Sequence, residues 1–280
     1  MRKFLFFDID GTLLGQSRVI TEKTKAAIEK ARSLGHKAFI CTGRAPTSLV
    51  GGVMDVEFDG YICSAGGFVI VNNEFIFENF INQYILGEVM TMFINNHIEF
   101  VLETKKAMYE TPRYSSLIAL KMMANNTNPE LIRQFQLRKQ GENRFPISQF
   151  NILNTGCTKV CFLAEDKEAF MKLIPFLDDF FNVVFFSKET ESHLQGEIIL
   201  KHCTKADGII KVVNHFKGKM KDTIAFGDSM NDYQMLEVAN TSVVYEGASQ
   251  ELLDLGDYFF VDPDEDGIAK VMEELGLLHV

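Results

Sequence analysis

The chain has 280 residues, of which 46% are hydrophobic, and its 28 basic and 38 acidic residues give a formal net charge of −10. This length allows one large or two moderate domains, and this composition is typical of a globular protein. The negative charge disfavours nucleic acid and anionic membranes as partners. No stretch approaches the roughly 20 apolar residues of a membrane span, and no cleavage site follows the N-terminal apolar run, so we expect a cytoplasmic protein.

The cysteines do not form a disulfide or metal-binding pattern. They are odd in number, lie mostly in apolar strand-like runs and include no Cys-x-x-Cys pair, so we interpret them as buried thiols. They are Cys41, Cys63, Cys157, Cys161 and Cys203.

The first third of the chain alternates apolar strand-like runs with a helical pattern, which favours a parallel sheet. Thr21 is a plausible helix cap and Gly35 a plausible stop, so the intervening segment is expected to be helical. An Asn72-Asn73 turn between two apolar runs predicts a hairpin. The predicted elements are strands over 3–9, 37–41 and 61–64, a helix over 21–34 and a hairpin over 68–77.

The middle of the chain follows a different pattern from its two ends. It predicts helices over 85–95, 115–123 and 167–177 and strands over 98–102, 159–163 and 183–186. The last 80 or so residues return to strand and helix alternation, with helices over 204–216, 231–238 and 268–275 and strands over 222–226 and 241–244.

These patterns predict an α/β protein with a Rossmann-like, doubly wound parallel sheet as its core and an inserted α+β domain. We expect residues 1–81 and 190–280 to form the discontinuous core and residues 82–189 to form the insertion. Ligands of such sheets bind beyond the carboxyl ends of the strands, and that is where the candidate polar residues lie.

The first predicted strand ends in two carboxylates and a glycine. Asp8 and Asp10 share one face if the strand stays regular, and Gly11 allows the backbone to turn away. Paired carboxylates favour a bound cation, and an ionised, accessible carboxylate can attack an electrophile.

Polar residues follow two further predicted strands. Thr42, Gly43 and Arg44 follow the second one, and a threonine hydroxyl with adjacent amides suits an anionic oxygen. Near the C-terminus a third strand ends in acids and an amide, which are Asp228, Asn231 and Asp232. Lys205 precedes a predicted helix and can place a positive charge beside a phosphoryl oxygen.

The candidate ligands favour magnesium. Asp8, Asp10 and Asp228 are hard oxygen donors, and a few carboxylates with open positions suit Mg²⁺. The six histidines are scattered without ligand spacing, so we expect no competing histidine site.

Four segments in this order and spacing resemble the motifs of the haloacid dehalogenase superfamily. They are Asp8-x-Asp10-Gly11-Thr12, Thr42-Gly43-Arg44, Lys205 and Gly227-Asp228-x-x-Asn231-Asp232. The long insertion between the second and third motifs resembles the large α/β cap of the Cof-type, class IIB phosphatases.

The resemblance implies covalent chemistry on the first two acids. Asp8 is then the nucleophile that forms an aspartyl-phosphate. Asp10 is the general acid toward the leaving oxygen and afterwards the general base toward water.

The same resemblance implies the binding residues. Thr42, Gly43 and Arg44 belong to the phosphate- and substrate-binding set, together with Lys205 and Asn231. Mg²⁺ is implied to bind Asp8, the Asp10 carbonyl and Asp228, while Asp232 supports the site.

One segment departs from the family pattern. Members usually carry Asn-Gly before the hairpin, whereas this chain has Ser64-Ala65-Gly66-Gly67. Ala65 in place of asparagine affects a substrate-side or turn contact and leaves the chemistry of Asp8 untouched.

The resemblance therefore leads us to expect an enzyme, a Mg²⁺-dependent phosphatase of a small phosphorylated metabolite. Sugar phosphates are the commonest substrate class of the family that it resembles. An acid at position 10 favours phosphatase over dehalogenase chemistry, because a leaving alkoxide needs a proton. The alternatives are a phosphomutase of the same superfamily and a non-catalytic binder of a phosphorylated ligand.

No dinucleotide-binding or Walker-type glycine motif is present. We expect a monomer or weak dimer without nucleic-acid or membrane partners.

Overall fold

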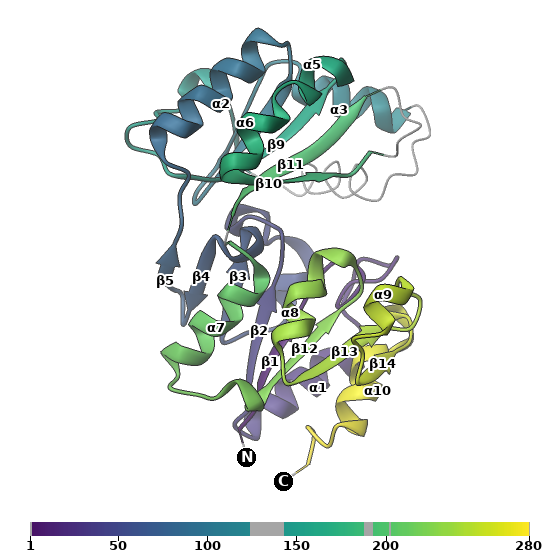
Figure 1. Ribbon diagram of the computed structural model, residues 1–280. Helices are drawn as coiled ribbons and strands as arrows, with labels where there is room; N and C mark the ends of the chain where they lie inside the picture. The colour runs from purple at the N-terminus through teal and green to yellow at the C-terminus, as the bar shows by residue number, and fades with distance from the viewer. Residues whose placement is uncertain (1, 124–142, 188–192, 202, 280) are drawn as a thin grey trace. The chain divides into compact units, whose positions relative to one another are not determined.

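The computed structural model describes residues 2–123, 143–187, 193–201 and 203–279. It divides into two compact units (Figure 1). The core unit comprises Met1–Arg44, Gly51–Glu78 and Cys203–Val280, and the inserted unit comprises Ala45–Val50 and Asn79–His202.

The core unit is built on an eight-stranded sheet with the order β14-β13-β12-β1-β2-β3-β4-β5. The first six strands of this order pair in parallel, and β4 and β5 are antiparallel. The strands are β1 (Phe4–Phe7), β2 (Lys37–Cys41), β3 (Gly60–Cys63), β4 (Phe68–Val71), β5 (Glu74–Glu78), β12 (Thr223–Gly227), β13 (Thr241–Tyr245) and β14 (Tyr258–Phe260).

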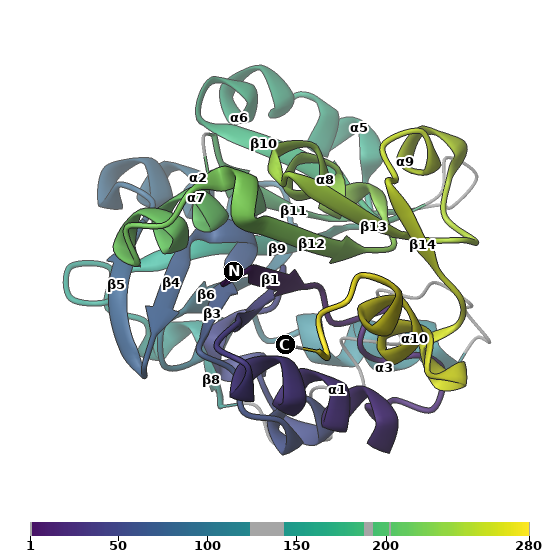
Figure 2. The same ribbon diagram turned by 90° about the horizontal axis from the view of Figure 1, so that it is seen from below.

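Helices cover both faces of this sheet, as a doubly wound fold requires (Figure 2). In the figure α7 (Lys205–His215) and α8 (Tyr233–Val238) lie on one face, while α1 (Glu22–Ser33) and α10 (Gly267–Glu274) lie on the other. The short helix α9 (Gln250–Leu253) follows β13. All four residues of β1 are buried, because a strand covered on both faces must be apolar throughout.

The inserted unit has its own six-stranded sheet, with the order β10-β11-β9-β6-β7-β8. Its neighbours pair antiparallel except for β7 with β8. The strands are β6 (Glu99–Thr104), β7 (Met108–Glu110), β8 (Arg144–Pro146), β9 (Cys157–Ala164), β10 (Phe181–Phe185) and β11 (Leu194–Leu200).

Among its described residues, the inserted unit is packed by a larger and a smaller apolar cluster. The larger one contains Phe93 of α2 (Gln83–Asn95), Phe170 of α5 (Lys167–Met171) and Leu177 of α6 (Ile174–Phe180). The smaller one packs α3 (Tyr114–Met123) and Ala45 against β6 and β9. The Ala45 backbone directly follows Arg44, so the chain passes from the second sequence motif into the inserted unit.

The α/β fold class, with its parallel core sheet and inserted unit, is confirmed. The expected boundary of the insertion at 189/190 differs from the structure, because β11 pairs with β9 and β10 in the sheet of the inserted unit. The single helix expected over 167–177 is two helices, α5 and α6. Pro175 lies in the first turn of α6, where its missing N–H is tolerated.

The predicted thiols and the predicted hairpin are both present. All five cysteines are buried thiols that form no disulfide. Asn72 and Asn73 have left-handed φ values of 49° and 65°, as a tight two-residue hairpin turn requires. Within the described ranges, no helix combines the length and the apolar run needed to cross a membrane.

Candidate active site

The sheet register brings two acidic strand ends together. Phe7 at the end of β1 pairs with Phe226 of β12, and the Asp8 N–H donates to the Phe226 carbonyl at 3.0 Å. Asp8 and Asp228 therefore leave neighbouring strands at the same edge of the sheet. Gly11 has φ +99°, and a side chain there would overlap the Asp228 carboxylate, so glycine is needed for this close approach.

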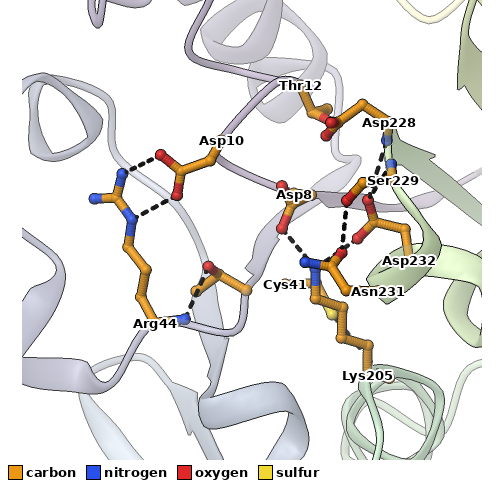
Figure 3. A network of polar contacts seen from close by, with 11 residues as sticks. Asp8, Asp10, Thr12, Cys41, Arg44, Lys205, Asp228, Ser229, Asn231 and Asp232 are labelled. Atoms are coloured by element: carbon orange, nitrogen blue, oxygen red, sulfur yellow. Dashed lines mark hydrogen bonds and ion pairs between the residues drawn. The ribbon is translucent and has the colours of Figure 1, made fainter. Parts of the chain in front are cut away.

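Lys205 reaches this edge from the first turn of α7. Thr204 and Asp207 form a capping box that fixes the start of the helix. The Lys205 Nζ then lies 2.6 Å from Asp8 Oδ1 and 2.5 Å from Asp232 Oδ1, and it donates to Asn231 Oδ1 at 3.3 Å. Figure 3 shows these side chains converging on the lysine.

Asp232 is held on its other oxygen by backbone groups. Its Oδ2 accepts from the N–H groups of Asp228 and Ser229 at 3.0 and 3.2 Å. This capping arrangement begins the turn after β12 and orients the buried carboxylate toward Lys205.

Three carboxylates form a candidate metal-binding cluster. One oxygen each from Asp8, Asp228 and Asp232 lies within 4.8 Å of the others. Together with the Lys205 ammonium they carry two net negative charges when ionised, which a divalent cation would neutralise. Carboxylate oxygens are hard ligands, so this donor set fits a hard divalent cation such as Mg²⁺.

The pKa shifts of these groups reflect their burial first and the nearby charges second. Burial raises the pKa of Asp8 to about 7 against the opposing charge of Lys205. Burial also raises the pKa of Asp228, and the charges of the other two acids add to that rise. Burial alone would lower the pKa of Lys205, but its adjacent carboxylates raise it above the ordinary value.

The second motif lies beside the first. The Thr42 N–H donates to Ile62 of β3 at 2.8 Å, and the Thr42 hydroxyl accepts from the Arg44 N–H at 3.1 Å. Apart from its two chain neighbours, no described residue has an atom within 4 Å of the position that a Gly43 side chain would take, so this side of the backbone is open.

Arg44 and Asp10 form a bidentate ion pair (Figure 3). The Arg44 Nε lies 2.9 Å from Asp10 Oδ2, and its Nη2 lies 2.7 Å from Asp10 Oδ1. The Asp10 side chain thus points to the arginine, while the carboxylates of the metal-binding cluster come from Asp8, Asp228 and Asp232. The predicted contact of Arg44 with substrate and the predicted metal bond from the Asp10 carbonyl stay predictions.

Two contacts were missed by sequence reasoning. The Thr12 hydroxyl donates to Asp228 Oδ1 at 2.8 Å and so orients a candidate metal ligand. Its place in the first motif was the available signal. Arg18 Nη1 lies 2.7 Å from Asp10 Oδ1; a single arginine in a polar loop carried no signal for that contact.

The turn that departs from the family pattern is packed against the second motif. The Ser64 and Ala65 N–H groups donate to the carbonyls of Arg44 and Thr42 at 2.8 and 3.0 Å. Ala65 has φ +53°, a left-handed conformation that asparagine or glycine adopts more readily. Ala65 therefore keeps the turn at the cost of backbone strain.

The chain matches proteins of one family over nearly its whole length. Residues 5–272 match the family model of haloacid dehalogenase-like hydrolases. The Bacillus subtilis protein YkrA, whose name assigns it to the phosphatases, is 27% identical over 277 residues, covering 99% of this chain and 98% of that one. YwtE of Bacillus subtilis, named a 5-amino-6-(5-phospho-D-ribitylamino)uracil phosphatase, is 23% identical over 288 residues and 98% of each chain.

Solved structures show the same fold. BT4131, described as a sugar phosphatase of subclass IIB of the haloacid dehalogenase superfamily, superposes with a TM-score of 0.76 at 24% identity. The match covers 98% of this chain and 99% of that chain. The family match agrees with the acids at the strand ends and with the buried lysine beside them. The chain belongs to the haloacid dehalogenase-like hydrolase family.

Proposed function

We propose that this hydrolase is a Mg²⁺-dependent phosphatase of a small phosphorylated metabolite, acting through an aspartyl-phosphate on Asp8. The observation that carries the proposal is the position of the Asp8 carboxylate. It is buried, lies 2.6 Å from the Lys205 ammonium and shares a cluster with two further acids. Such a carboxylate is oriented for attack, and the charge that develops around it meets a fixed cation.

In the first step an oxygen of Asp8 bonds to phosphorus as the bond from phosphorus to the leaving oxygen breaks. Lys205 offsets the negative charge on Asp8 and on the phosphoryl oxygens. Asn231 and Asp232 both contact the Lys205 ammonium and hold it in place. Phosphoryl transfer depends mainly on such positioning and charge stabilisation.

The phosphoryl oxygens are assigned to the second motif. The open space beside Gly43 and the neighbouring Thr42 hydroxyl support this assignment, since backbone amides and hydroxyls suit anionic oxygen. Arg44 contacts Asp10, and its part in substrate binding is proposed to act through that contact.

Asp10 is the proton-transfer residue in this proposal. It gives a proton to the leaving oxygen in the first step. In the second step it takes a proton from the water that cleaves the aspartyl-phosphate.

Mg²⁺ is assigned to Asp8, Asp228 and the Asp10 carbonyl, and Asp232 is the third acid of the carboxylate cluster. When bound, the ion supplies positive charge to the phosphoryl oxygens and to the acids. The three carboxylates and the Lys205 ammonium together leave two net negative charges, which supports binding of a divalent ion.

Sugar phosphates are our first substrate class. BT4131 is described as a sugar phosphatase, and YwtE is named for a phosphorylated ribityl compound. Both names concern phosphate esters of a polyol or sugar chain, which supports the same class here.

The test is phosphate release from a panel of sugar phosphates, nucleotides, pyridoxal phosphate and flavin mononucleotide, with Mg²⁺ or with a chelator. Asp8→Asn is compared with Asp254→Asn, which makes the same substitution at an exposed acid of the core unit. We expect metal-dependent turnover that Asp8→Asn abolishes and Asp254→Asn retains. Mass spectrometry of quenched enzyme should find the phosphate on Asp8.

Two outcomes would replace the proposal. Phosphate that stays on Asp8 and passes to a second substrate hydroxyl instead of water would identify a phosphomutase. A folded wild-type protein that binds phosphorylated ligands without turnover or labelling of Asp8 would identify a binding protein.

A further inference from the structure

Two guanidinium groups hold the Asp10 carboxylate. Arg44 binds both carboxylate oxygens, at 2.9 and 2.7 Å, and Arg18 binds Oδ1 at 2.7 Å. The Arg44 side chain is 5% exposed, that of Arg18 is 31% exposed, and that of Asp10 is 23% exposed. Charge-assisted pairs of this geometry fix the direction of a carboxyl group as well as its position.

The loop that carries Arg18 is fastened by Asp264, from the other end of the chain. Asp264 Oδ2 accepts from the Ser17 N–H at 2.9 Å, and its Oδ1 accepts from the Ser17 hydroxyl at 2.6 Å. Its carboxylate also occupies the space beside Gly15, where a side chain atom would lie 2.5 Å from Oδ1. The residue before Arg18 is therefore fixed in both backbone and side chain.

Arg18 itself has an unusual backbone conformation. Its φ is +59°, a left-handed value that residues with a side chain seldom adopt. Its N–H donates to the Gly15 carbonyl at 3.3 Å, and the next N–H, of Val19, donates to the Ser17 hydroxyl at 3.3 Å. Left-handed residues persist where the surroundings determine them, and here the result is a guanidinium directed at Asp10.

We propose that Arg18 is a positioning residue that acts through Asp10, with Asp264 as the anchor that holds Arg18 in place. This inference rests on the proposed role of Asp10. In the first step the proton moves from the Asp10 carboxyl group to the leaving oxygen as the phosphorus bond to Asp8 forms. In the second step a proton moves from water to Asp10 as the water oxygen bonds to phosphorus and the bond to Asp8 breaks. The two guanidinium groups pair with the ionised carboxylate, which is the form that accepts the proton from water in the second step, and they set its direction. The protonated form that acts in the first step gives up one of these contacts to carry its proton.

A double-mutant cycle tests this role. Arg18→Gln, Asp10→Asn and the double variant are compared on p-nitrophenyl phosphate, whose leaving group departs without a proton and so keeps Asp10→Asn measurable. In the wild-type background we expect Arg18→Gln to lower kcat about tenfold or more, with KM changed by less than about threefold. In the Asp10→Asn background the same substitution should change kcat by less than about twofold.

A second cycle uses only variants that retain Asp10. Asp264→Ala should lower kcat, and it should add nothing when Arg18 is already glutamine. Arg18→Lys, which keeps one charged donor, should recover part of the lost kcat. Arg2→Gln, which removes an exposed arginine elsewhere in the core unit, should leave kcat unchanged.

An equal loss of kcat from Arg18→Gln in both Asp10 backgrounds would overturn the inference, and so would a rise in KM with kcat unchanged. The first result would show a general structural role, and a lowered melting temperature would accompany it. The second would show direct substrate binding. Failure of the proposed function has a different signature, which is a wild-type protein without phosphate release or an Asp10→Asn variant with the wild-type rate.

Discussion

The core unit and the inserted unit each bury one lysine between two carboxylates. In the core unit Lys205 Nζ lies 2.6 Å from Asp8 and 2.5 Å from Asp232. In the inserted unit Lys159 Nζ lies 2.8 Å from Glu197 and 3.3 Å from Glu103. Both lysine side chains are 1% exposed.

The surroundings of the two lysines differ. The acids near Lys205 stand where strands end and the backbone turns away, and Asp228 adds a third carboxylate. Lys159 lies within β9, and its two acids lie on the flanking strands β6 and β11. Among the described residues only the core cluster has three acids spaced to hold a metal ion. We therefore connect the proposed catalytic site with the excess of acid at the strand ends and not with a buried, paired lysine as such.

The largest expected difference is in turnover. Lys205→Met removes the cation beside the nucleophile, so we expect kcat to fall about a hundred- to thousandfold. Lys159→Met should change kcat per folded molecule by less than about threefold. Steady-state kinetics on the best substrate of the panel, normalised to folded protein by circular dichroism, measures both. Similar losses in the two variants would remove the distinction.

The next effect concerns stability in the inserted unit. Lys159→Met removes the cation beside the buried Glu103 and the partly buried Glu197, and we expect a loss of about 3–5 kcal/mol in the free energy of unfolding. Replacing all three residues, as Glu103→Met, Lys159→Met and Glu197→Met, should restore most of that loss. Urea unfolding followed by fluorescence or circular dichroism measures this. A triple variant no more stable than the single one would contradict the expectation.

A pH effect should be specific to the core unit. Burial raises the pKa of Asp8 from 3.8 to about 7. Between these two pH values the folded, metal-free protein therefore holds a proton on Asp8 that the unfolded chain has lost. This contribution to stability is complete below pH 3.8 and is lost as the pH rises through 7; its full size is up to about 4 kcal/mol. The difference in unfolding free energy between wild type and Asp8→Asn, followed from pH 4 to 8 in a chelator, should show the decline. Added Mg²⁺ should oppose it, and a difference that does not vary with pH would contradict the assignment.

The smallest effects come from left-handed residues in the two units. Ala65 in the core unit has φ +53°, and His97 after α2 in the inserted unit has φ +55°. Ala65→Gly and His97→Gly should each raise the free energy of unfolding by about 0.5–1 kcal/mol, because glycine adopts this conformation without strain. Equal gains in the free energy of unfolding would show that Ala65 contributes only local backbone strain. A loss for Ala65→Gly alone would show that the methyl group of Ala65 makes stabilising contacts.

The parts of the core that are fixed by local pattern could be predicted from the sequence. Apolar runs that end in acids identified β1 and β12, and parallel strands bring their carboxyl ends to one edge, so Asp8 and Asp228 were placed together correctly. The predicted lysine, Lys205, also joins them, since a capped helix start fixes its position.

Contacts that depend on loop conformation could not be predicted. Arg18 contacts Asp10 from a loop in which Ser17 binds Asp264, a residue far away in sequence. The pairing of Arg44 with Asp10 likewise depends on the direction of two long side chains. The residue types alone left Arg44 equally suited to bind phosphate.

The inserted unit was harder to predict, because the register in which its strands pair decides which side chains meet. Lys159 meets Glu103 and Glu197 only through the pairing of three strands. The strand β11 was missed, although it completes that pairing, and the end of the insertion was therefore placed too early. Pro175 was passed over as part of one helix, although a proline fits only the first turn of a new one.

The central place of β1 has a consequence for synthesis on the ribosome. This strand pairs with β2 nearby in sequence and with β12 near the other end of the chain, and Thr12 binds Asp228 across 216 residues. The inserted unit draws all six of its strands from the intervening stretch, so its sheet is complete in the nascent chain before β12 has emerged. Until then β1 has an open edge, which long-range pairing closes slowly and which can pair with another chain. The acidic cluster forms only after Asp228 and Asp232 have emerged, so a prematurely terminated product that lacks β12 and the turn after it retains Asp8 without the other two acids.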